Sequence, residues 1–179
     1  MADRLSAEIR IGGRIPAAAV PGLCGAIGDQ NVGLAWGDCG FWPQTAADLL
    51  EACTDHGGRR WLCLYDDGLP WGAFATVENF LQRQGIAYDR FTLAKDAYPP
   101  TIFAFRTETG VLELETTADH DPVVPMKRLA GLETILQAAA RQPKGNGSAH
   151  QVIEAALCAL RKALPPRVEP LPALEVVDG

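Results

Sequence analysis

Several features are missing from this 179-residue sequence. No apolar run reaches the roughly 20 residues that a membrane helix needs, so we expect no membrane contact. Lysine is scarce, and the 16 basic residues are outnumbered by 22 acidic ones, which gives a net charge of -6. A general nucleic-acid binder needs cationic surface, so nucleic acid is not the expected partner. The N-terminus lacks a basic stretch followed by an apolar run, so we expect no signal peptide and a cytoplasmic location.

The cysteines also lack a pattern that would give them a chemical role. There are five of them, with no CxxC pair and no zinc-like spacing. Three lie within apolar helix-like or strand-like segments: Cys24, Cys63 and Cys158. Free thiols in a reducing compartment account for such an odd, scattered set. We therefore expect no disulfide scaffold and no cofactor. The excess of Arg over Lys, with abundant Ala, Gly and Pro, indicates a bacterial protein from a GC-rich genome.

The composition that remains is that of an ordinary globular protein, with 47% hydrophobic and 21% charged residues. The length favours one domain that can bury a sizeable core. We expect a single α+β domain over residues 1–142 and a flexible link over 143–147. A helix over 148–164 would pack on that core or on a partner, and 165–179 would be an extended or disordered tail.

Two stretches fifty-four positions apart carry the same apolar pattern. The matched pairs are Ile15 and Leu69, Pro16 and Pro70, Val20 and Phe74, Leu23 and Val77, Ile27 and Leu81, Val32 and Ile86, and Leu34 and Tyr88. Only the proline is identical, and each stretch follows a short strand-like run. The pattern predicts a strand–helix–strand unit that occurs twice.

Hydrophobic periodicity and turn residues place the secondary structure. Strands are predicted over 7–11, 32–36, 60–65, 86–91, 101–106 and 111–115, and helices over 15–28, 46–55, 74–84, 126–142 and 148–164. Two successive strand–helix–strand units pack most simply as a ferredoxin-like, split βαβ sheet with helices on one face. The hairpin over 101–115 and the two C-terminal helices would extend it. The alternative is an open, mostly parallel three-layer α/β sheet.

Metal-type ligands are densest shortly after the predicted hairpin. The candidate metal ligands are Asp66, Asp67, Asp119, His120 and Asp121, and Glu113 and Glu115 lie close to the last three in the sequence. Carboxylates with a histidine suit a hard divalent cation. The spacing alone shows no convergence, and acidic residues are also common in solvated turns. A small metal-dependent enzyme is therefore an alternative interpretation.

Two further chemical motifs are weaker. Gly12-Gly13-Arg14 joins a strand to a helix, where backbone N–H groups could hold a phosphate, but its spacing fits no known phosphate loop. A Cys–His nucleophile would have to combine Cys39 or Cys53 with His56 or His120, and no flanking pattern supports that. Because the sequence shows no constellation that catalysis demands, we favour a protein that is not an enzyme.

Aromatic residues in Gly/Pro-containing loops are the best candidates for a contact surface. They are Trp36, Phe41, Trp42 and Trp71. Tryptophans more often fold back over the edge of a core, which is the competing interpretation. A sheet-face reader of single-stranded nucleic acid would instead use aromatic and arginine residues on neighbouring strands: Tyr88, Arg90, Phe103, Phe105 and Arg106. The basic glycine-aromatic strand motif of such readers is absent.

We therefore expect a small interaction or accessory module that binds a protein partner or a second copy of itself. The contact would use the aromatic loops, the edge of the hairpin or the last helix. A metal-dependent enzyme and a single-strand nucleic-acid binder are the alternatives.

Overall fold

The computed structural model describes residues 3–124, 126–140 and 148–178. The elements are β1 (Arg4–Ile11), β2 (Gly13–Pro16), a 3-10 turn (Ala17–Ala19), α1 (Val20–Gln30), α2 (Ala46–Glu51), β3 (Cys53–His56), β4 (Arg59–Pro70), α3 (Ala75–Gln84), β5 (Tyr88–Thr92), β6 (Thr101–Arg106), β7 (Gly110–Glu115), α4 (Met126–Ala140), α5 (Ser148–Ala163) and β8 (Leu174–Val177). None of the helices in these ranges is long and apolar enough to cross a membrane.

The chain forms two compact units, where one domain over 1–142 was expected. The main unit comprises Met1–Asp121 and Val168–Gly179, and the hairpin unit comprises Pro122–Arg167. The boundary falls before α4, which packs against α5 within the hairpin unit.

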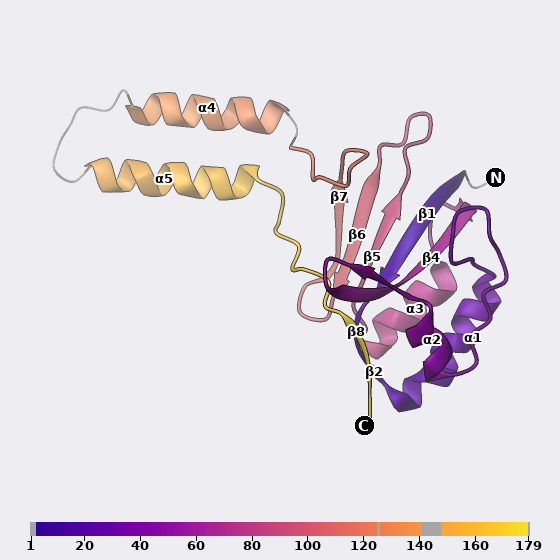
Figure 1. Ribbon diagram of the computed structural model, residues 1–179. Helices are drawn as coiled ribbons and strands as arrows, with labels where there is room; N and C mark the ends of the chain where they lie inside the picture. The colour runs from indigo at the N-terminus through magenta and orange to yellow at the C-terminus, as the bar shows by residue number, and fades with distance from the viewer. Residues whose placement is uncertain (1–2, 125, 141–147, 179) are drawn as a thin grey trace. The chain divides into compact units, whose positions relative to one another are not determined.

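The main unit is built on a six-stranded sheet in the order β3-β4-β1-β5-β6-β7 (Figure 1). Every neighbouring pair in this sheet is antiparallel, which confirms the α+β class. The alternative of a mostly parallel sheet is therefore wrong. Alternate residues of β1, among them Ile9 and Ile11, are fully buried in one apolar cluster with residues of α1 and α3, so these helices cover one face of the sheet.

The two matched stretches bury corresponding positions along most of their length. Val20, Leu23 and Ile27 of α1 and their counterparts in α3 all belong to the core, and the two helices pack against each other. The correspondence fails at the last pair, because the side chain of Leu34 is 40% exposed whereas that of Tyr88 is fully buried.

The strand predicted over 32–36 is wrong for a local reason. Its only pairing is an isolated bridge between Gly33 and Tyr65. The chain then turns back, since Asp38 N–H donates to the Ala35 carbonyl and the backbone at Asp38 crowds Gly33.

The start of the first strand–helix–strand stretch also differs from the prediction, because the C-terminal strand β8 pairs with it. Gly13–Pro16 is a strand, parallel to β8, and the predicted helix begins only at Val20. A Cβ on Gly12 would lie 2.2 Å from the Pro172 carbonyl oxygen, so this close approach requires glycine. Gly12 N–H donates to Ala87 and Gly13 N–H to Ala173. These donors are therefore already used, and the turn offers no phosphate cradle.

The tail expected over 165–179 is extended, but it is part of the fold. Val168 packs against the small apolar cluster of Phe91, Ile102 and Leu114 on the sheet face opposite the helices. Trp61 Nε1 then donates to the Pro172 carbonyl at 3.0 Å, and β8 follows. Thr45 and Asp48 form a capping box at the start of α2. The helix ends at Glu51, short of the predicted residue 55, because Cys53 begins β3.

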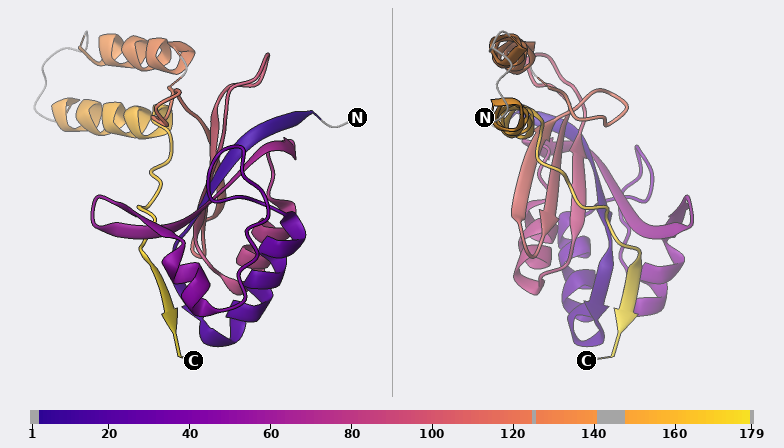
Figure 2. Two further views of the ribbon diagram at one scale, coloured as in Figure 1. Left: turned by 45° about the vertical axis from the view of Figure 1, so that its right-hand side comes forward. Right: turned by 90° about the vertical axis from the view of Figure 1, so that its left-hand side faces the viewer.

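The hairpin unit consists of α4 and α5, which lie side by side (Figures 1 and 2). Both helices match their predicted ranges closely. The predicted flexible link over 143–147 lies outside the described residues.

Candidate functional site

One candidate site is a pocket of about 320 Å³ in the main unit, near the lower end of the range of ligand sites. Three aromatic rings and two carboxylates line it: Trp71, Tyr98, Phe103, Glu113 and Glu115. Leu5, Pro99 and two threonines complete the wall. Neither carboxylate forms a hydrogen bond or an ion pair in the described part of the chain, although the negative charge of Glu113 acts on the buried Arg90 guanidinium.

The register of the sheet brings these residues together. Phe103 pairs with Arg90 on one side and with Glu113 on the other, while Thr101 pairs with Thr92 and Glu115. Directly opposite residues of antiparallel strands share a face of the sheet. Two rows of side chains therefore run across β5, β6 and β7 on this face, and each row ends in a carboxylate, one in Glu113 and the other in Glu115. This is the face that α3 covers at Arg90.

Trp71 also lines the pocket, and its backbone has a strained conformation. Its φ is 56°, which is rare for a bulky residue and costs on the order of 1–3 kcal/mol. The side chain is nevertheless 53% exposed, so burial does not compensate for the strain. Its ring makes an edge contact with Tyr98, with 6.0 Å between centroids. Gly72 follows, and a Cβ there would lie 2.5 Å from Thr92 Cγ2.

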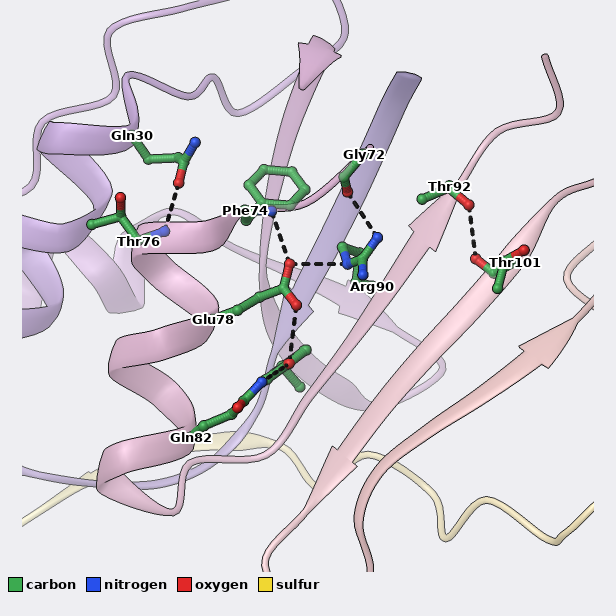
Figure 3. A network of polar contacts seen from close by, with 10 residues as sticks. Gln30, Gly72, Phe74, Thr76, Glu78, Gln82, Arg90, Thr92 and Thr101 are labelled. Atoms are coloured by element: carbon green, nitrogen blue, oxygen red, sulfur yellow. Dashed lines mark hydrogen bonds and ion pairs between the residues drawn. The ribbon is translucent and has the colours of Figure 1, made fainter. Parts of the chain in front are cut away.

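A buried polar network holds this loop in place (Figure 3). Arg90 Nη1 donates to the Gly72 carbonyl at 2.9 Å. Arg90 Nε lies 2.9 Å from Glu78 Oε1, an ion-pair contact whose N–H is not aligned for a hydrogen bond. The Glu78 carboxylate also accepts from Phe74 N–H, at the start of α3, and from the Tyr88 hydroxyl. The loop that carries Trp71 is thus tied to both α3 and β5.

Burial decides the electrostatics of the network, whereas the pocket is open to solvent. Desolvation lowers the pKa of Arg90, although Glu78 acts in the opposite direction. Desolvation and the negative charge of Glu78 raise the pKa of Tyr88. In the pocket wall, the Tyr98 hydroxyl donates to Asp3 Oδ2 at 2.7 Å, and this hydrogen bond raises the pKa of Tyr98. The Arg90 guanidinium lies 3.7 Å from the centroid of Phe103 and holds that ring in place.

The four aromatic residues predicted as a contact surface do not gather in one place. Trp36 makes an edge contact with Tyr65, and Phe41 packs partly buried against the core. Trp42 lies over Gly28 of α1, beside a separate pocket. Only Trp71 belongs to the pocket with the carboxylates.

The predicted metal ligands do not converge. In the described residues, which include all five candidates, no three His, Cys, Asp or Glu side chains could hold a metal ion together. His120 instead stacks on Phe91, with 4.2 Å between ring centroids, and burial lowers its pKa. Asp119 and Asp121 donate their backbone N–H groups to Thr117 Oγ1 within a tight turn, and Asp66 accepts from Gly68 N–H within β4. The geometry gives the metal-dependent interpretation no support.

The residues considered for nucleic-acid binding are mostly unavailable. Tyr88 and Phe105 stack on each other in the core. Arg106 is buried, pairs with Asp89 at 2.8 Å and donates to the Glu169 carbonyl. With Arg90 paired to Glu78, only Phe103 can reach a ligand, and it does so in the pocket described above.

His56 does lie close to a cysteine, but to Cys63 and not to Cys39 or Cys53. Cys63 Sγ lies 3.8 Å from His56 Nε2, and Thr54 Oγ1 contacts both atoms. Burial raises the pKa of Cys63, so the thiol form is favoured. Nucleophilic cysteines need the opposite shift. The cluster therefore does not form an activated nucleophile.

Three of the five main pocket residues were not among the binding residues predicted from the sequence: Tyr98, Glu113 and Glu115. Tyr98 precedes Pro99-Pro100 and meets the criterion applied to the tryptophans, an aromatic residue in a Pro-containing loop. Glu113 and Glu115 were noted only as neighbours of the proposed metal ligands. No protein-family model matches the chain, and neither a curated protein nor a solved structure matches it significantly.

Proposed function

We propose that this protein is a non-enzymatic interaction module whose main unit binds a cationic side chain of a protein partner. The observation that carries the proposal is the pocket in which Trp71, Tyr98 and Phe103 meet the unpaired carboxylates of Glu113 and Glu115. Aromatic faces attract ammonium and guanidinium groups, and carboxylates nearby add Coulomb attraction and hydrogen bonds. A lysine or arginine side chain fits this chemistry, whereas an anionic ligand would be repelled.

The strain at Trp71 supports a binding role. A half-exposed tryptophan with positive φ contributes little to the core, yet a buried network fixes the adjacent backbone. Strain of this kind concentrates at ligand sites, where a rigid wall lowers the entropy cost of binding. A binding role accounts for both the exposure and the rigidity.

The test is a titration of the full chain with two short peptides that differ at one central position, lysine or norleucine. Norleucine keeps the aliphatic chain and removes the charge. Tryptophan fluorescence should respond to the lysine peptide and not to the norleucine peptide. Glu113→Gln should weaken binding about tenfold, the loss of one charge-assisted contact.

Glu108→Gln is the matched control. The substitution removes the same charge, and Glu108 is exposed in the connection between β6 and β7. Equal binding of both peptides, or equal effects of the two variants, would count against a cation-specific pocket.

We further infer that the sheet is a reduced ferredoxin-like arrangement in a cytoplasmic protein of bacterial origin. β4 and β5 are both antiparallel to β1, which lies between them, and α3 connects them, as in a split βαβ unit. The Gly33 bridge to Tyr65 supports a remnant of the second strand on the other side of β4. An experimental structure that pairs residues 32–34 with a different strand would contradict this inference.

A further inference from the structure

Within the hairpin unit, α4 and α5 leave much of each other's apolar surface uncovered. Six large aliphatic residues of the hairpin unit are 39–56% exposed: Leu129, Ile135, Leu136, Ile153, Leu157 and, just after α5, Leu164. Those of α5 repeat at helical spacing and form one stripe. Two helices can cover only one side of each other, so a helical hairpin by itself cannot enclose such stripes.

The surface has the composition of a helix–helix interface. A groove of about 500 Å³ runs between α4 and α5, lined by Leu132, Ile135 and the small residues Gly131, Ala155 and Ala159. Small residues let a neighbouring helix approach closely. Residues 122–167 contain no Phe, Trp or Tyr, so only aliphatic side chains make up this apolar surface. Aliphatic side chains on facing helices form the core of a four-helix bundle.

We propose that the α4–α5 hairpin docks on the same hairpin of a second copy, so that two chains form a four-helix bundle. The exposed parts of these six residues amount to roughly 500 Å² per hairpin. Their complete burial between two hairpins would remove roughly 1,000 Å² of surface from water, about the least that a biological interface should bury. A two-fold arrangement uses one self-complementary face and closes without further copies. This proposal is independent of the pocket in the main unit.

Charge gives the dimer a distinctive salt dependence. Residues 122–167 hold seven Lys or Arg and two Glu, while the rest of the chain is strongly acidic. Two hairpins therefore repel each other electrostatically while their apolar faces attract. Added salt screens the repulsion, so it should tighten the dimer. An acidic partner or an anionic membrane would show the opposite dependence.

The experiment is sedimentation velocity of the full chain over a range of concentrations at low and high NaCl. We expect a mass twice that of the chain, with a lower Kd at high salt. Leu157→Glu and Ile153→Glu should each weaken the dimer at least tenfold with unchanged helical circular dichroism. Leu157→Ala, which adds no charge, should weaken it less. Leu34→Glu is the control, because Leu34 is comparably exposed but lies in the main unit.

Two results overturn the proposal. One is a monomer at all concentrations, whether or not it co-sediments with phosphatidylglycerol vesicles. Co-sedimentation would point to a lipid surface, and its absence would point to an occupant within the chain or to a different partner. The other is a dimer whose Kd is the same in Leu157→Glu and Ile153→Glu as in the control Leu34→Glu. That result would place the interface outside the α4–α5 hairpin.

Discussion

Asn31 and Gly85, fifty-four positions apart, end α1 and α3 in the same way. Both have left-handed backbone conformations, with φ of 55° and 67°. Each backbone N–H donates to the carbonyls three and four residues earlier, in α1 those of Gly28 and Ile27. The apolar offset between the two stretches therefore extends to their helix caps, which supports a repeated unit more strongly than side-chain pattern alone.

Substitution by alanine should have opposite effects at two glycines, Gly85 in the cap of α3 and Gly25 inside α1. Gly85→Ala should lower the free energy of unfolding by about 1–2 kcal/mol, because a Cβ is disfavoured in the left-handed region. That Cβ would meet Thr107 only at 3.6 Å, so no clash adds to the cost. Gly25→Ala, inside α1 with nothing within 4 Å, should raise it by about 0.5–1 kcal/mol. Urea unfolding of both variants checks the sign, and destabilisation by both would contradict the assignment.

The parts of the fold that could be predicted are those in which local spacing and burial agree. Leu23 and Val77 lie on helix faces whose period is visible in the sequence, and both are core residues. The strand over 32–36 could not be predicted correctly, because apolar residues form a strand only where a partner edge is free. Beside Tyr65 the chain turns away after one bridge. The pairing of β8 with β2 joins segments about 160 residues apart, which no local pattern encodes.

In the candidate site, too, local sequence features could be predicted and long-range pairing could not. An aromatic residue in a Gly/Pro loop was enough to select Trp71. Its strain was not visible, because φ depends on how the Arg90 network holds Gly72. Glu113 could be assigned to the pocket only through the β6–β7 register that sets it opposite Phe103. Sequence spacing placed it instead near Asp119, with which it forms no metal-type group in the part of the chain that the structure describes.

The tyrosines predict a loss of stability in alkaline solution. Burial, together with the charge of Glu8, raises the pKa of Tyr65 to about 12, while an unfolded chain has its ordinary value of about 10. Between these values the folded state keeps a proton that the unfolded state has lost. The contribution to stability is therefore complete below pH 10 and is lost as the pH rises toward 12.

Absorbance at 295 nm, which follows phenolate, measures this directly. The pKa values of Tyr88 and Tyr98 are also raised, so the folded protein should show little phenolate at pH 10. Urea unfolding should give a lower free energy at pH 11 than at pH 9, with a smaller difference in Tyr65→Phe. Titration of all three tyrosines near pH 10 before unfolding would contradict the burial of Tyr65 and Tyr88.

The Glu78–Arg90 pair predicts strong coupling between two substitutions. Arg90→Met leaves the Glu78 carboxylate buried without its cation, which should cost about 3–5 kcal/mol. Glu78→Gln removes the charge but keeps a carbonyl oxygen for Phe74 N–H. The double variant should lose less stability than the sum of the two single variants, by at least about 1 kcal/mol. A double-mutant cycle from chemical unfolding measures the difference, and strict additivity would show that the contact is not energetically coupled.

Trp71→Gly separates a binding role of the ring from a structural one. Glycine adopts φ of 56° without strain, so the substitution should recover on the order of 1–3 kcal/mol, while the lost edge contact with Tyr98 should cost about 0.5–1.5 kcal/mol. On these two effects the free energy of unfolding should lie between about 0.5 kcal/mol below and about 2.5 kcal/mol above that of the wild type, whereas binding of the lysine peptide should be lost. Trp42→Gly, at the other exposed tryptophan loop, should keep the peptide response. If Trp71→Gly instead destabilises the protein by several kcal/mol, or still binds the peptide, then the ring supports the fold and the pocket is not the contact site.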